Sequence, residues 1–147
     1  MAKNKSQFDF EVIQKKLSEF DENVSQLEKI QKSLNLDVFL NNKQQQWSVE
    51  HGLQLCIQQV IDLGSHILVS LHLNNIEDYS DVGVKLGKHG ILSKELSKRV
   101  IEMIKFRNLL IHEYVHVDPE KVFEIFKTGI SDLKAVSNQI KAFIKKQ

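Results

Sequence analysis

The stretch RNLLIHEY, residues 107–114, places charged and polar side chains inside an apolar helix pattern. It lies late in a run, from about residue 94 to 115, whose spacing predicts a helix. At about 100° per residue, Arg107 points from the middle of one apolar face. That face is made by Val100, Met103, Ile104, Leu110 and Ile111. Phe106 and Leu109 make the opposite side apolar too, so the helix is expected to be wrapped on nearly all sides and the arginine to have a specific task.

Two more polar side chains belong with this arginine. Tyr114 follows seven residues later and returns to within about 20° of Arg107 on the helix. His112 is expected at the edge of the same face, one turn above Asn108. The pattern therefore predicts that an arginine, a histidine and a tyrosine gather at one end of one helix.

Before this stretch, the chain predicts a long helix and then a short one. Ser6 with Asp9 three residues later is a helix start of the capping-box kind. The seam that follows, with spacings of three and four, consists of Phe10, Ile13, Leu17, Phe20, Val24, Leu27, Ile30 and Leu34. Residues 35–42 predict a turn and a short helix.

A second long helix is expected from about Gln44 or Ser48 to Leu73. One of its faces is apolar throughout, and the other mixes Leu55 and Val69 with polar residues. On that other face Asp62 and His66 are one turn apart and can form a hydrogen bond. They are either a polar pair satisfied within the bundle or its interface, or part of a site.

Three further helix starts are expected in the second half of the chain. A short helix begins near Ser80, and Ser93 caps the helix that carries RNLLIHEY, which must stop by His116. Asp118 as N-cap with Pro119 at the first helical position is the clearest start signal in the chain. The last helix is expected to bury Phe123, Phe126, Ile130, Leu133, Ile140 and Ile144.

Four long amphipathic helices and one or two short ones predict an all-α, up-and-down helical bundle. Alternation at period two is nearly absent, so strands are not expected. At 147 residues, the whole chain, 1–147, is expected to form a single domain. Both the second long helix and the RNLLIHEY helix show a second, partly apolar face, which predicts a homodimer.

Composition and charge exclude several classes of protein. With 20 basic and 19 acidic side chains, the formal charge of +1 gives no global attraction to nucleic acid or to an anionic membrane. No signal-peptide pattern or membrane span is found, so a cytoplasmic protein is expected. The lone Cys56 lies in an apolar run and is expected to be a small buried side chain in a reducing compartment.

His112-Glu113-Tyr114-Val115-His116 fits the zinc-peptidase pattern HExxH. That chemistry needs both imidazoles on one helix face, and Pro119 ends the helix soon after His116. No strand is expected that could hold a peptide substrate, and the other histidines make no convincing ligand set. A zinc peptidase therefore ranks low, and no metal or other cofactor is expected.

For Arg107 and His112 two interpretations remain open. In the structural one, a buried arginine pairs with a carboxylate and the histidine only ends a helix. In the functional one, the pair cleaves a phosphodiester. Histidine can take a proton from a ribose 2′-hydroxyl or give one to the leaving oxygen at neutral pH. The planar guanidinium of arginine can donate two parallel hydrogen bonds to the phosphoryl oxygens as negative charge builds up on them.

The order Arg107, four residues, His112, one residue, Tyr114, with Asn108 after the arginine, resembles the signature of the HEPN superfamily and specifically of HepT-like toxins. Three other segments are similar to the same family: residues 49–67, 79–92 and 117–120. The resemblance covers nearly the whole chain, from about Phe8 to Ile144.

The resemblance implies an all-helical homodimer in which Arg107 and His112 of both protomers line a shared cleft. It implies a metal-independent endoribonuclease that is the toxin of a toxin–antitoxin pair, with RNA as substrate. The implied partner is a nucleotidyltransferase antitoxin of the MNT type, which transfers AMP to Tyr114. The resemblance also makes Asn108, Asp62 and His66 supporting candidates. RNA affinity then depends on whether basic residues such as Lys98, Arg99 and Lys105 gather near the cleft.

A second interpretation belongs to another class of protein: a catalytically silent helical dimer that only binds the nucleotidyltransferase. The sequence leaves open whether the RNA is tRNA or mRNA, where it is cut, and how many AMP units Tyr114 receives. It also leaves open whether the toxin is active in its host, and the stoichiometry of the complex with the antitoxin.

Overall fold

In the part of the chain that the structure describes, the fold is all-α, as predicted, with four long helices and two short ones. The computed structural model describes residues 9–73, 75–112 and 116–147, and that part of the chain contains no strand. The helices are α1 (Phe10–Ser33), α2 (Leu36–Leu40), α3 (Lys43–Ser70), α4 (Ser80–Lys88), α5 (Lys94–Ile111) and α6 (Pro119–Lys145).

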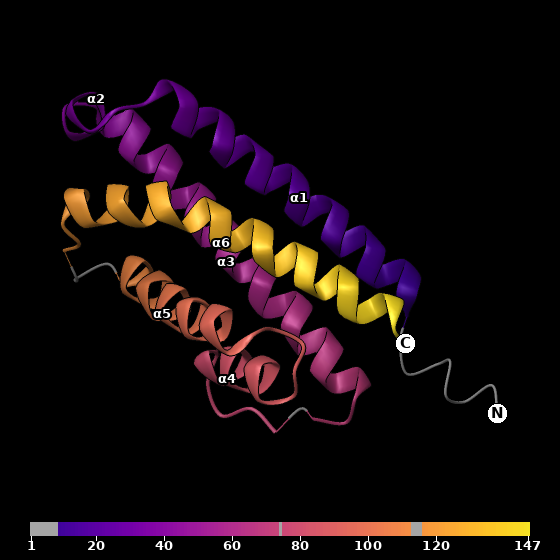
Figure 1. Ribbon diagram of the computed structural model, residues 1–147. Coiled ribbons are helices and arrows are strands. Elements are labelled where there is room, and N and C mark those ends of the chain that lie inside the picture. Colours follow the sequence, from indigo (N-terminus) through magenta and orange to yellow (C-terminus); the bar gives the residue numbers. More distant parts are fainter. Residues whose placement is uncertain (1–8, 74, 113–115) are drawn as a thin grey trace.

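The long helices pack around one apolar core. α3 lies in the middle of the bundle and contacts α1, α2, α4, α5 and α6, while α6 contacts α1 and α5 as well (Figure 1). The buried side chains of these helices form one continuous cluster, which includes Phe20, Phe39 and Phe126. Since α5 contacts α3, α4 and α6, the side chains near its end can meet groups from three other helices.

Most helix starts follow the predicted caps. The side chain of Ser93 accepts a hydrogen bond from the backbone N–H of Leu96 at 3.2 Å, and that of Asp118 accepts from Glu120 at 3.0 Å. The first helix is capped by Asp9, whose carboxylate accepts from Val12. Ser6, predicted to share that start, lies outside the described residues.

α3 ends three residues earlier than the predicted Leu73. His72 takes a left-handed backbone conformation, with φ 61°, which no helix can continue. The N–H of Leu73 then reaches back to the carbonyl of Leu68 at 2.8 Å and satisfies one of the last free carbonyls of the helix. A left-handed C-terminus is usually marked by glycine, so a histidine there gives no sequence signal.

α5 ends at Ile111, so the prediction of a helix to about residue 115 was wrong. His112 has φ −74° and ψ 112°, an extended conformation outside the helix. α6 begins at Pro119 and packs back against α5, so the chain must leave the α5 helix before that point. The last turn of α5 is also less covered by neighbouring elements than expected, because Leu109 is 47% exposed and Ile111 is 45% exposed.

Two glycines allow α4 to approach its neighbours closely. A Cβ at Gly64 of α3 would collide with Val82 and Leu86 of α4, and one at Gly87 of α4 would collide with Ser97 of α5. The buried Ser97 hydroxyl donates to the carbonyl of Gly83 at 2.7 Å, which ties α4 to α5. This close packing fixes the segment before α4 beside α5.

Cys56 is fully buried, as predicted, and burial raises the pKa of its thiol to about 12. Among the described residues, no helix combines the length and apolar character needed to cross a bilayer.

Candidate functional site

Arg107, in the last turn of α5, is held by side chains from three parts of the chain. Its Nη2 donates to Oε1 of Gln58 on α3. Its Nη1 donates to Oδ1 of the neighbouring Asn108 at 3.0 Å. The guanidinium carbon lies 5.2 Å from the ring centroid of Tyr79, which precedes α4 and provides a cation–π contact. The guanidinium plane is therefore restrained from several sides.

This guanidinium is positively charged, and no carboxylate among the described residues pairs with it. None of the ion pairs among the described residues involves Arg107, so the expected alternative of an arginine neutralised by a carboxylate is not found there. Its Nε is buried and has no hydrogen-bond partner among these residues. A half-buried arginine with neutral partners retains the ability to attract an anion.

Gln58 connects Arg107 to a carboxylate on its own helix. Its amide Nε2 donates to Oδ1 of Asp62, one turn on, at 2.9 Å. Asp62 therefore accepts from Gln58, and the hydrogen bond with His66 that their spacing allows does not form in the structure. Asp62 is exposed and His66 is half-buried, so the two are not a buried polar pair either. The reason is geometric: Gln58 is also four residues from Asp62, and it lies on the Arg107 side.

Tyr79 is positioned by the turn that starts α4. The carboxylate of Asp81 accepts from the backbone N–H of Glu77 at 2.9 Å, and the carboxylate of Asp78 accepts from that of Asp81 at 3.2 Å. The hydroxyl of Ser80 donates to Asp78, and this hydrogen bond is the main cause that lowers the pKa of the Asp78 carboxyl. The Tyr79 side chain is still 50% exposed, so part of the ring beside the guanidinium stays open to solvent.

The remaining predicted site residues lie at or near the end of α5. Asn108 is half-buried and bonded to Arg107, as its place beside the arginine suggests. His112 is exposed immediately after the helix, so it does not sit one helical turn above Asn108 as predicted. Tyr114 and Glu113 lie outside the described residues. Arg107, Asn108 and His112 thus mark one end of α5, with Asp62 linked to them through Gln58.

The sequence did not point to Gln58 or Tyr79. Gln58 carries a weak signal, because it lies one turn before Asp62 on the less apolar face of α3. Tyr79 carries none, since its contact with Arg107 depends on how closely α4 packs against α5.

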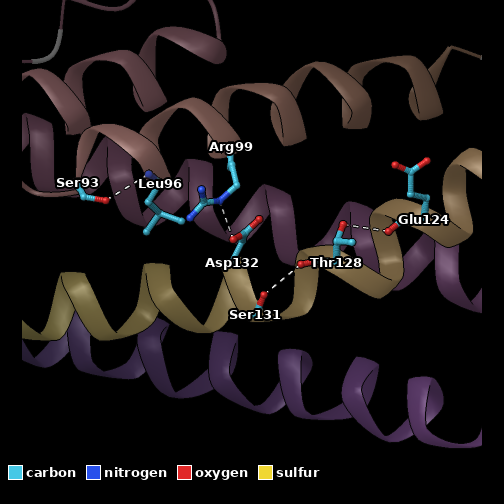
Figure 2. A network of polar contacts seen from close by, with 7 residues as sticks. All are labelled: Ser93, Leu96, Arg99, Glu124, Thr128, Ser131 and Asp132. Atoms are coloured by element: carbon cyan, nitrogen blue, oxygen red, sulfur yellow. Dashed lines mark hydrogen bonds and ion pairs between the residues drawn. The ribbon is translucent and has the colours of Figure 1, made fainter.

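The basic residues considered for RNA binding lie mainly on another side of α5. Lys98, Arg99 and Lys105 line a groove of about 510 Å³ between α5 and α6, together with Lys121. Lys98 and Lys105 are about 180° and 160° from Arg107 around the helix. Within the groove Arg99 is paired with Asp132 at 2.8 Å, the link between α5 and α6 drawn in Figure 2. These cations therefore do not surround Arg107 within one chain.

The HExxH interpretation loses its structural basis. A zinc site of that type needs both histidines on one helix face, whereas His112 is extended and His116 precedes α6 outside any helix. In residues 9–73, 75–112 and 116–147, no three His, Cys, Asp or Glu side chains are grouped as they would be around a metal ion.

Comparisons with known proteins agree on one family. Residues 20–140 match the family model described as Ribonuclease HepT-like. A tRNA nuclease HepT from Aphanizomenon flos-aquae is 32% identical over 112 residues, which cover 76% of each chain. An mRNA nuclease HepT from Shewanella oneidensis is 26% identical over 95 residues, or 65% of this chain and 71% of the relative.

Solved structures share the fold. The tri-AMPylated HEPN toxin of Shewanella oneidensis, in complex with an MNT antitoxin, superposes with a TM-score of 0.81. The match covers 89% of this chain and 97% of that toxin at 21% identity. A cytosolic protein of unknown function from Bacillus subtilis gives a TM-score of 0.79 at 15% identity.

Proposed function

The chain belongs to the ribonuclease HepT-like family, and we propose that it is a metal-independent endoribonuclease toxin whose chemistry is carried by Arg107 and His112. The observation that carries this proposal is the guanidinium of Arg107, which is held by neutral side chains and keeps its charge for an anion. The substrate is RNA in the cytoplasm. Whether it is tRNA or mRNA stays open, because relatives of both kinds match.

The proposed reaction is a transfer within the RNA strand. The ribose 2′-oxygen attacks the adjacent phosphorus while His112 takes the hydroxyl proton, and the bond to the 5′-oxygen of the next nucleotide breaks. That oxygen receives a proton from an imidazolium, and a second His112 across a two-fold axis can supply it. Arg107 binds the phosphoryl oxygens and stabilises the charge that accumulates on them in the transition state.

The shared site requires a homodimer. Leu55, Asp62 and Val69 follow one another at intervals of seven residues and so form one stripe along α3. Leu55 is 38% exposed and Val69 is 54% exposed in the single chain, although both are apolar. Ile111, one turn after Arg107 on α5, is 45% exposed as well, so α3 and α5, the helices joined at the Arg107 site, together present an exposed apolar surface. Burying this surface against a second copy would bring the two sites together.

Control by an MNT-type nucleotidyltransferase completes the proposal. Transfer of AMP to Tyr114 would add a negatively charged phosphate close in sequence to His112 and Arg107. The guanidinium of Arg107 could then pair with that phosphate in place of RNA. A tri-AMPylated relative in complex with its MNT antitoxin supports this form of control.

The test measures cleavage of RNA with excess EDTA. Wild-type protein is expected to cut, while Arg107→Ala and His112→Ala should each lose at least about a hundredfold in rate. Lys121→Ala, in the groove between α5 and α6, is the matched control and should cut normally. Cleavage that EDTA abolishes would contradict the proposal. No cleavage by any form would favour a silent dimer that only binds the nucleotidyltransferase.

A further inference from the structure

Arg107 must be both fixed in place and left charged to act on a phosphate. A free arginine side chain has many rotamers, so an unanchored guanidinium would rarely sit where the transition state forms. An anchoring carboxylate would neutralise it and compete with the phosphate for the same fork. A neutral acceptor avoids both difficulties.

Gln58 is such an acceptor, and the groups on both sides fix the direction of its amide. A guanidinium only donates hydrogen bonds and a carboxylate only accepts them. With Arg107 on one side and Asp62 on the other, the amide oxygen must face the arginine and the amide nitrogen must face the aspartate. A flipped amide would place its NH2 group against the guanidinium donors and its oxygen against the carboxylate, so Asp62 favours the orientation that binds Arg107.

Other contacts also restrain the guanidinium of Arg107, but none of them takes over the role of Gln58. The Tyr79 ring covers one face of the guanidinium, and Asn108 accepts from Nη1 along the same helix. Of the groups described around Arg107, Gln58 alone accepts its hydrogen bond from another helix. It thereby sets the distance of the guanidinium from α3.

We propose that Gln58 is a positioning residue of the ribonuclease, which holds Arg107 at the reaction site without neutralising it, and that Asp62 acts through Gln58 by orienting its amide. The inference rests on the proposed function, because it assigns a role relative to Arg107. Gln58 itself is not expected to touch the reacting atoms.

Two substitutions of Gln58 distinguish the loss of the anchor of Arg107 from the neutralisation of its charge. In Gln58→Leu the guanidinium stays charged but loses its anchor, so kcat should fall about tenfold or more while KM for RNA changes little. In Gln58→Glu the guanidinium stays anchored but is paired with a carboxylate, so KM should rise about tenfold. Each measurement uses the full-length protein with an RNA substrate and EDTA.

Gln59→Leu is the matched control. It makes the same substitution one residue further on and removes a hydrogen bond from Asn23 of α1 at 3.1 Å, away from Arg107. It should retain wild-type kcat and KM. If Gln58→Leu behaves like Gln59→Leu, or if Gln58→Glu behaves like wild type, the inference is overturned.

A double-mutant cycle tests the role given to Asp62. Asp62→Ala should lower kcat less than Gln58→Leu, and adding it to Gln58→Leu should cause no further loss. Independent, multiplying losses would show that Asp62 acts on its own and overturn that part. Arg107→Ala is measured alongside. Full activity in Arg107→Ala would reject the proposed function as a whole, whereas its loss beside a normal Gln58→Leu would reject only the role of Gln58.

Discussion

Arg107 shows how a single side chain can be predicted in part. Its place in the middle of an apolar helix face is visible in the sequence, because helix periodicity alone sets it. Its partners are not visible. Gln58 lies 49 residues away, and only the packing of α3 against α5 brings the two together. Asp62 and His66 had two interpretations, a polar pair or part of a site. Within one chain the structure shows no such pair, because Gln58 of the same helix donates to Asp62 instead.

Cys56 gives a prediction about pH. Its folded-state pKa is about 12, above the ordinary value of 9.0 for an exposed thiol, so the folded protein holds the proton more tightly than the unfolded chain. This contribution to stability is fully present below pH 9 and is lost as pH rises towards 12. By pH 10 the wild type should lose about 1 kcal/mol through this thiol.

Urea unfolding at pH 8 and pH 10 measures the effect. Cys56→Ala, which has no titrating group at this position, should lose less stability than the wild type over the same interval. Equal losses in the two proteins would show that the thiol is not perturbed by burial.

At the scale of the elements, local signals set where helices begin better than where they end. Asp118 with Pro119 and Ser93 predicted two starts correctly, because an N-cap is a contact within one turn of chain. The ends of α3 and α5 were placed too late. α3 ends beside a histidine in a left-handed conformation, and α5 ends before the chain turns towards α6. Neither helix end is marked by a local sequence signal. Because α5 ends at Ile111, His112 lies after the helix and not within it as predicted.

Gly64 tests the close packing of α4. In Gly64→Ala the added methyl group collides with Val82 and Leu86, so the free energy of unfolding should fall by about 1–3 kcal/mol. Gly129→Ala of α6 is the control. Its methyl group would meet only the end of Met103 at 3.4 Å, and alanine favours the helix, so stability should stay equal or rise. Chemical denaturation of both variants makes the comparison, and similar losses would contradict the account of α4.

At the scale of the whole molecule, the helical bundle followed from the amphipathic pattern, and its assembly remains a prediction. The same stripe of α3 that Gln58 and Asp62 occupy also exposes Leu55 and Val69. Sequence alone marked this face as partly apolar, and the structure leaves it uncovered in a single chain. Whether the chain is one domain over residues 1–147 also stays a prediction, since the first eight residues lie outside the described part.

Val69→Lys tests the dimer. Placing a charge on the exposed α3 stripe should shift the protein from a particle of twice 17.0 kDa to the single chain and reduce RNA cleavage in parallel. Val12→Lys, on an exposed position of α1, is the control and should remain dimeric. Light scattering after gel filtration gives the mass, and a wild type that is already monomeric and active would contradict a shared site.

The most direct measurement compares RNA cleavage by His112→Ala and His116→Ala in EDTA. The two histidines are four residues apart in the sequence and both are exposed, and only His112 directly follows the helix that carries Arg107. We expect His112→Ala to be inactive and His116→Ala to cut at the wild-type rate. Equal rates for the two variants, whether both fast or both lost, would contradict this expectation.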